Sequence, residues 1–179
     1  MSVQIGQGVL SREEILRLIG SSPPLLEGML DPESQIQPNG IDITVETVSR
    51  FRGTGLLARS NADRVLPATE DITFEPDGSL YLPAGAYQVR FNETVNLPIS
   101  LMAYARPRSS LLRSGVALHT AVWDAGYSGR GVSLMVVYHP AGFRLERDAR
   151  ICQLVFHPLV AETGAGYQGA YQHEGAVAD

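Results

Sequence analysis

The chain has 179 residues, of which 44% are hydrophobic, and a formal net charge of −5 at pH 7. This length fits a single domain over residues 1–179 with a sizeable core. The negative charge argues against a nucleic-acid platform, and no apolar run reaches the length of a membrane span. No secretory signal is recognisable, and a lone Cys152 cannot form an internal disulfide. We therefore expect a cytoplasmic protein without nucleic-acid or membrane partners.

Turn-forming residues occur throughout the chain, which contains 18 glycines and 11 prolines. Frequent turns between short apolar runs are typical of a sandwich or barrel, so the composition predicts an all-β fold. The 14 basic residues are all arginines. Any phosphate site must therefore use guanidinium groups and hydroxyls instead of a lysine.

One helix is expected in the N-terminal segment, residues 1–30. Ser11 is placed to cap it, and Glu14 three residues later completes a capping-box pattern. Gly20 is placed to end it. The apolar stripe consists of Ile15, Leu16, Leu18 and Ile19. We expect this helix to cover one end of a sheet.

Period-two patterning follows a turn signal at residues 38–40. Ile41, Ile43 and Val45 alternate with polar residues, which predicts a strand with one apolar face. Asp42 then points away from that face. The pattern by itself favours a solvated strand residue at Asp42 over a functional one.

The middle of the chain is predicted to contain mainly short strands. Residues 52–80 look like a long irregular loop that ends in a hairpin signal at 76–78. Strands are expected at residues 80–82, 86–95, 101–105, 132–138, 143–145 and 149–156. Gln153 is the one polar interior residue of the last strand, and a buried amide needs hydrogen-bond partners. A structural role and a site role for Gln153 remain equally open.

The residues with the most chemistry lie between Arg106 and Gly131. Four hydrogen-bond donors for an anion occur within six positions: Arg108, Ser109, Ser110 and Arg113. Asp124 follows eleven residues after Arg113, in front of a glycine turn. A cationic, hydroxyl-rich loop followed by one acid indicates phosphate chemistry with a positioned base. The chain has no Walker loop, no GxGxxG in a βαβ context and no HExxH motif, and the four histidines lack metal-ligand spacing.

The C-terminal segment, residues 164–179, has no core-forming pattern. Its tyrosines and glutamines stand among glycines and comprise Tyr167, Gln168, Tyr171 and Gln172. We expect a flexible tail, which is either a flap that closes on a ligand or a disordered terminus.

Four segments carry a family resemblance. QPNGIDITV, PRSSLLRSG, HTAVWDAGYSGRG and ARICQLVF occur in the order and spacing of the motifs of the dUTPase and dCTP deaminase superfamily. They most resemble the archaeal-type deoxyuridine triphosphate nucleotidohydrolases, over about Gln35 to Tyr171. The resemblance implies a distorted, jelly-roll-like β-barrel with a short N-terminal helix. It also implies a homotrimer with active sites at the subunit interfaces.

The resemblance implies that residues of the first, second and fourth motifs bind the phosphate chain. Asp42 would support the metal–triphosphate region through water, without a direct metal ligand in the chain. Arg108, Ser109 and Ser110 would hold the phosphates, and Arg113, which matches an arginine of the deaminase branch, would be a catalytic residue near the reacting end of the ligand. Gln153 would lie near the phosphates.

The third motif is implied to hold the nucleoside and the catalytic base. Asp124 would orient and deprotonate the attacking water, and Tyr127 would pack on the deoxyribose. Backbone groups of His119, Thr120 and Ala121 would read the base, while the His119 side chain is either a contact or structural. Tyr167, Gln168 and Gln172 would close the site, although this tail departs from the glycine- and serine-rich arm of ordinary dUTPases.

The implied reaction is the hydrolysis of dUTP to dUMP and diphosphate, with Mg²⁺ bound to the triphosphate. The deaminase branch uses a glutamate on the strand after the third motif. That position is Leu134 here, next to Met135, and residues 132–138 contain no acid. We therefore expect no dCTP deamination. The alternatives are a dCTP deaminase, a bifunctional enzyme, or a catalytically silent nucleotide-binding trimer.

Overall fold

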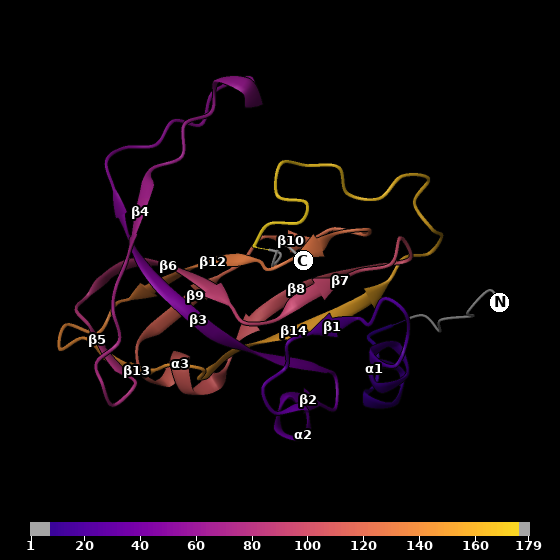
Figure 1. Ribbon diagram of the computed structural model, residues 1–179, viewed down its shortest axis with the longest axis horizontal. Helices are drawn as coiled ribbons and strands as arrows, with labels where there is room; N and C mark the ends of the chain where they lie inside the picture. Colours follow the sequence, from indigo (N-terminus) through magenta and orange to yellow (C-terminus); the bar gives the residue numbers. More distant parts are fainter. Residues whose placement is uncertain (1–7, 176–179) are drawn as a thin grey trace.

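The computed structural model describes residues 8–175 and is mostly β (Figure 1). The elements are α1 (Arg12–Ile19), β1 (Leu26–Glu27), α2 (Pro32–Gln35), β2 (Ile36–Gln37), β3 (Gly40–Arg52), the 3-10 helix η1 (Asn61–Asp63), β4 (Ala68–Asp71), β5 (Ser79–Leu82), β6 (Gly85–Phe91), β7 (Thr94–Asn96), β8 (Leu101–Pro107), α3 (Ser109–Arg113), β9 (Val116–His119), β10 (Val122–Trp123), β11 (Ser128–Gly129), β12 (Val132–Val137), β13 (Phe143–Glu146) and β14 (Arg150–Pro158).

A nine-stranded sheet organises the fold. Seven of its strands follow the order β10-β8-β14-β3-β6-β12-β9, while β2 and β4 pair with β3. Smaller sheets of order β1-β7-β11 and β13-β5 complete the β structure. The strand pairs are antiparallel throughout the described chain. This architecture confirms the expected all-β class.

One apolar cluster fills the interior of the fold. Its largest fully buried side chains include Phe91, Phe156, Ile41, Ile43, Leu101, Met135 and Leu154. They come from β3, β6, β8, β12 and β14, so the long central strands supply most of the core. Aromatic and branched side chains suit a pleated surface that is covered on both sides.

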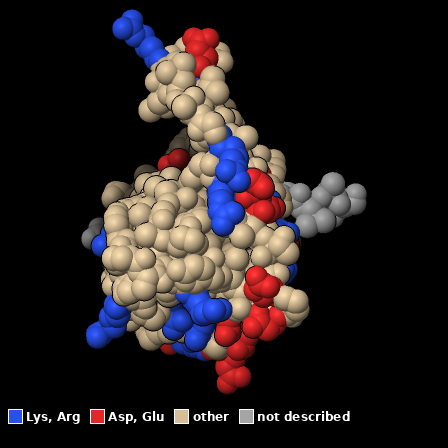
Figure 2. Space-filling model, turned by 90° about the vertical axis from the view of Figure 1, so that its left-hand side faces the viewer, with Lys and Arg blue, Asp and Glu red and all other residues tan. Residues whose placement is uncertain are grey.

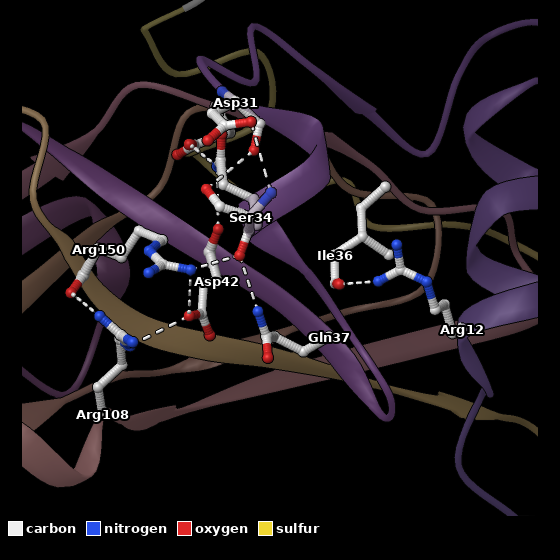
Figure 3. A network of polar contacts seen from close by, with 10 residues as sticks. Arg12, Asp31, Ser34, Ile36, Gln37, Asp42, Arg108 and Arg150 are labelled. Atoms are coloured by element: carbon white, nitrogen blue, oxygen red, sulfur yellow. Dashed lines mark hydrogen bonds and ion pairs between the residues drawn. The ribbon is translucent and has the colours of Figure 1, made fainter.

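The expected helix forms as α1, and Ile15 is its fully buried residue. The capping-box interpretation is wrong, because Ser11 occupies the N-cap without a side-chain cap hydrogen bond. Glu14 instead pairs with Arg17 at 2.9 Å, one turn along the exposed face. The start of α1 is tied to the sheet by Arg12, whose guanidinium donates to the carbonyl of Ile36 (Figure 3).

The prediction of a solvated Asp42 is also wrong. Every residue from Gly40 to Val45 is buried, because both faces of β3 are covered. On the polar face, Glu93 accepts hydrogen bonds from Thr44 N at 3.0 Å, Thr44 Oγ1 at 2.6 Å and Gln35 Nε2 at 2.6 Å. Period-two patterning identified the strand correctly, but it cannot tell whether the polar face meets water or other polar side chains.

Residues 52–80 are more regular than expected. β3 continues to Arg52 and pairs with β4, and an arm of residues 53–67 extends beyond this pair. The arm closes on itself at Leu56 and Val65, yet Leu57 is 85% exposed. Figure 2 shows the arm as a narrow projection from the body. The turn at 76–78 forms as predicted, with Gly78 at φ +80°.

Along residues 8–175, no helix has the length and apolar character needed to cross a membrane.

Candidate active site

A cavity of about 460 Å³ lies beside α3, and we name it the arginine cavity. Arg108, Arg144 and Arg150 line it together with Ser110 and Glu146. β8 ends at Pro107, and Arg108 is the extended N-cap residue of α3, at φ −63° and ψ 147°. The strand-to-helix corner therefore presents a guanidinium and a hydroxyl at the wall of the cavity.

Asp42 lies behind this wall and joins two of its arginines (Figure 3). Its Oδ2 is 3.0 Å from Arg108 Nε and 3.5 Å from Arg150 Nη1, and its side chain is 4% exposed. Burial raises the pKa of Asp42, while Arg108, Arg150 and the Gln153 amide each favour the ionised carboxylate. Arg108 comes from the corner between β8 and α3, whereas Arg150 and Gln153 both come from β14, which pairs with β3.

A cavity of about 490 Å³ on another part of the molecule contains the second acid of interest. Tyr127, Tyr167 and Tyr171 line it with Asp124 and Trp123, and we name it the tyrosine cavity. The Asp124 side chain is exposed and has no hydrogen bond to residues 8–175. A free carboxylate at the wall of a largely aromatic cavity can accept a proton from a bound water.

The turn that carries Asp124 depends on a glycine. Tyr127 N–H donates to the Asp124 carbonyl at 3.1 Å, and Gly126 has φ +82°. A Cβ at Gly126 would come within 2.5 Å of Gly166 Cα. Both the left-handed backbone and the close approach of the C-terminal segment therefore require glycine here.

Tyr127 is 6% exposed, with its ring 5.7 Å from that of Tyr167 at an interplanar angle of 67°. Burial, with smaller contributions from Glu174 and Tyr167, raises the pKa of Tyr127 to about 12. Its hydroxyl therefore stays protonated across the physiological range.

The C-terminal segment folds back over the Asp124 turn, toward β10 in Figure 1. Tyr167 N–H donates to Ala125 O at 2.8 Å, and Gln172 binds Ser128 N at 3.2 Å and Gly126 O at 3.0 Å. The arm also reaches this segment, because the Arg64 guanidinium lies 5.2 Å from the centre of the Tyr171 ring. The flexibility of the tail stays a prediction, but residues 164–175 clearly have a docked position.

The predicted site residues divide between the two cavities. Ala121, Asp124, Tyr127 and Tyr167 line the tyrosine cavity, whereas Arg108 and Ser110 line the arginine cavity. Neither cavity is lined by Ser109, Arg113, His119, Thr120, Gln153, Gln168 or Gln172. The two cavities share no lining residue, and Figure 1 places α3 below the sheet and the tail above it. The residues implied for one active site thus lie in two separate places on one chain.

Sequence reasoning missed Arg150 and Glu174. Arg150 lines the arginine cavity and Glu174 the tyrosine cavity. The one signal for Arg150 was a charged residue at the start of an apolar strand. Burial raises the pKa of Glu174, and Arg90 counters that shift.

The position of the deaminase acid is occupied by an apolar residue. Leu134 on β12 pairs with His119 on β9, and Met135 beside it is fully buried. No residue of β12 carries an acid.

The acids of the described residues are spread over the molecule. No group of three His, Cys, Asp or Glu residues within 8–175 could hold an ion. Asp42 lies against two arginines, and the tyrosine cavity is lined by two acids, Asp124 and Glu174. Mg²⁺ commonly binds through substrate phosphates and one or two carboxylates, which is the arrangement that these residues allow.

Comparison with known proteins identifies the class. The profile of the dCTP deaminase-like family matches residues 9–159, so the chain belongs to this family. It is 49% identical over 166 residues to a probable deoxyuridine 5'-triphosphate nucleotidohydrolase of Methanosarcina mazei, with 93% of this chain and 97% of the relative covered. A protein of the same description from Archaeoglobus fulgidus is 46% identical over 166 residues, covering 93% and 96%. The expected superfamily is thereby confirmed.

A solved structure supports the fold. The crystal structure of 2'-deoxycytidine 5'-triphosphate deaminase from Agrobacterium tumefaciens matches with a TM-score of 0.66 at 21% identity. The match covers 84% of this chain and 49% of that chain, so this protein spans about half the length of that structure.

Proposed function

We propose that this protein is a dUTP diphosphatase, which hydrolyses dUTP to dUMP and diphosphate. Relatives with that description cover nearly the whole chain at 49% and 46% identity. The arginine cavity suits a phosphate chain, and the tyrosine cavity suits an apolar nucleoside with a reacting water beside it. The cytoplasm, where deoxynucleotides are used, is part of the same proposal.

Asp124 is the proposed general base. It accepts a proton from water as the water oxygen attacks the α-phosphorus, and the bond from that phosphorus to the bridging oxygen breaks to release diphosphate. The exposed carboxylate of Asp124 at the cavity wall supports this role. Tyr127 would pack its buried, uncharged ring against the deoxyribose, leaving no room for a 2'-hydroxyl.

The phosphate chain would bind to Arg108, Ser109 and Ser110, with Gln153 nearby and Arg113 close to the reacting end. Mg²⁺ enters with the triphosphate and supplies charge neutralisation. Asp42 is the residue that the resemblance links to this metal through water. Guanidinium groups bind phosphate oxygens through two parallel hydrogen bonds, which compensates for the lack of lysine.

The separation of the two cavities supports a homotrimer with active sites between subunits. A dUTP molecule must meet Asp124 at one end and Arg108 at the other. Since the two cavities of one chain share no lining residue, the arginine cavity of one copy would face the tyrosine cavity of a second. Sedimentation of the purified protein as a monomer, with or without dUTP, would exclude this arrangement.

The remaining predicted residues would bind the uracil base and close the site over the nucleotide. Backbone groups of His119, Thr120 and Ala121 would read the uracil ring. Tyr167, Gln168 and Gln172 would close the tail over the bound nucleotide, for which the two hydrogen bonds of Gln172 to residues 126 and 128 offer support.

One observation carries the choice of hydrolysis over deamination. Deamination needs an acid to move protons at the cytosine ring, and Leu134 stands at that position beside His119. We therefore expect the protein to release dUMP and diphosphate from dUTP, and no ammonia from dCTP.

The test is a product analysis with dUTP and dCTP in parallel, in the presence of Mg²⁺. Diphosphate from dUTP and no ammonia from dCTP is the expected result. Ammonia above background would point to a deaminase or a bifunctional enzyme. Binding of dUTP without any product would leave a silent nucleotide-binding protein.

A further inference from the structure

Two guanidinium groups share one carboxylate at the wall of the arginine cavity. Arg108 Nε and Arg150 Nη1 lie 3.0 Å and 3.5 Å from the same atom, Asp42 Oδ2. Asp42 is 4% exposed, whereas Arg108 and Arg150 are 34% and 30% exposed. The carboxylate is therefore the most buried member of the cluster, and the two arginines that converge on it in Figure 3 line the cavity.

The contacts of Arg108 leave part of its hydrogen-bonding capacity free. Its Nε faces Asp42, and its Nη1 donates to the main-chain carbonyl of Arg150 at 3.5 Å. Its main-chain N–H donates to Ile151 O at 3.0 Å. Among residues 8–175, Arg108 Nη2 has no hydrogen-bond partner, so this nitrogen remains for an anion.

Arg150 has a further anchor outside this cluster. Besides Asp42, its Nη1 donates to the carbonyl of Ser34, at the end of α2. Gln37 Nε2 donates to the same carbonyl at 2.8 Å. Arg150 thus connects α2, β3 and the corner before α3, and it contacts the same Asp42 oxygen as Arg108.

We infer that Arg150 is a positioning residue: by sharing Asp42 with Arg108, it fixes the direction in which Arg108 presents its free N–H groups to the cavity. This inference rests on the proposed function for the nature of the ligand, the phosphate chain of dUTP. Asp42 balances the charge of one arginine, so the cluster keeps a net positive charge for the phosphate oxygens. Asp42 then acts as a shared counter-ion.

Loss of Arg150 has a defined structural consequence. Asp42 would keep Arg108 as its remaining cationic partner. A guanidinium and a carboxylate prefer a bidentate pair with two parallel hydrogen bonds. Arg108 would then turn its Nη2 toward Asp42 and withdraw it from the cavity.

The test is calorimetric binding of inorganic diphosphate to the full chain in metal-free buffer. The variants are Arg150→Met, Arg150→Lys and the matched control Arg144→Met. Arg144 lines the same cavity without a contact to Asp42, so the control removes an equal charge. We expect Arg150→Met to weaken binding about tenfold, the loss of roughly one charge-assisted hydrogen bond, and Arg144→Met to weaken it about twofold. Arg150→Lys should fall between, because an ammonium restores charge but not the planar fork.

A double-variant cycle with Arg108→Met tests the coupling. If Arg150 acts through Arg108, adding Arg150→Met to Arg108→Met should weaken diphosphate binding by no more than about twofold. The same cycle in dUTP turnover should show KM rising more than kcat falls, because the phosphate contacts exist before and during reaction.

Equal losses of diphosphate affinity in Arg150→Met and Arg144→Met would overturn the inference, as would a double variant whose loss is the product of the Arg108→Met and Arg150→Met losses. If Arg150→Met does not fold, full diphosphate affinity in Arg150→Lys would overturn it. A lack of diphosphate binding by the unaltered protein would also overturn it. Coupled diphosphate binding without dUTP turnover would instead remove the proposed function and leave the inference standing.

Discussion

The two cavities have similar volumes, about 490 and 460 Å³, but opposite chemistry. The tyrosine cavity is lined by aromatic residues and by two acids, Asp124 and Glu174, and the Asp124 side chain has no hydrogen-bond partner within residues 8–175. The wall of the arginine cavity contains three arginines and Glu146, and Asp42 is buried behind it between two of the guanidiniums. A proton acceptor must have a free carboxylate, whereas an anion-binding surface needs a carboxylate that holds its cations in place. The two aspartates therefore differ in burial and in charged partners, which is consistent with the different roles proposed for them.

The variant with the largest expected effect removes the proposed base of the tyrosine cavity and leaves the residues of the arginine cavity unchanged. Asp124→Asn should lower kcat for dUTP by about 10²–10⁴-fold, because the amide cannot accept the proton of water. Diphosphate binding should stay within about twofold, and the free energy of unfolding within about 0.5 kcal/mol. Steady-state turnover, calorimetry and urea unfolding measure the three quantities.

The matched control is Glu162→Gln, an exposed acid that lines neither cavity. It should have unaltered turnover. If Asp124→Asn also retains full turnover, Asp124 is not the base.

The corresponding variant beside the arginine cavity is Asp42→Asn. It removes the shared counter-ion, so diphosphate binding in metal-free buffer should weaken severalfold. Because the two guanidiniums are partly exposed, we expect a loss of only about 1–2 kcal/mol in the free energy of unfolding. If Asp42 acts as the counter-ion alone, the Mg²⁺ concentration for half-maximal turnover should not change. A higher Mg²⁺ requirement with unaltered diphosphate binding would favour the water-mediated metal role that the family resemblance implies.

A third carboxylate, Glu93, belongs to neither cavity and gives a smaller, pH-dependent effect. Burial raises the pKa of Glu93 above its ordinary value of 4.5, although Thr44 and Gln35 favour ionisation. The unfolded chain then loses its proton at lower pH than the folded protein, so Glu93 lowers stability as pH rises through and above 4.5. Glu93→Gln should flatten this decline in a urea unfolding series from pH 4 to 8. An identical pH dependence in both proteins would contradict the raised pKa.

The smallest expected effect concerns closure of the tyrosine cavity by the tail. Gln172→Ala removes hydrogen bonds to Ser128 N and Gly126 O, and should weaken docking of the tail by about 1 kcal/mol. The single tryptophan, Trp123, lines this cavity and reports on its opening. Acrylamide should quench Trp123 fluorescence more strongly in Gln172→Ala than in Val160→Ala, a truncation at a fully exposed position. Equal quenching would show that these two bonds do not hold the tail.

Much of the fold was predictable because the signals are local. Turn residues, apolar alternation and the Ser11–Gly20 helix pattern depend on neighbours along the chain, and they predicted most strands and α1. Predictions failed where contacts with residues distant along the chain decided the local structure. The capping box did not form, and residues 52–80 gained order from pairing with β3.

The candidate site was predicted only as a set of residues. Family motifs named Asp42, Arg108, Asp124 and Tyr127, but sequence order does not say which of them share a cavity. Arg150 was missed because its importance comes from a contact with Asp42, which is distant along the chain. Similarly, the pattern left the tail open between a flap and a disordered terminus, and its hydrogen bonds to residues 125–130 gave it a docked position.

The sequence by itself determined the β class, the order of the four motifs, the absence of lysine and the lack of an acid at Leu134. These are properties of composition and spacing, so folding does not alter them. The tertiary structure alone decided that Asp42 is buried, that Arg150 joins Arg108, and that Asp124 and Arg108 line separate cavities. The reason is that β8, β14 and β3 become neighbours through antiparallel pairing of distant segments. Side chains on adjacent strands then set each other's burial and charge environment, which no local pattern records.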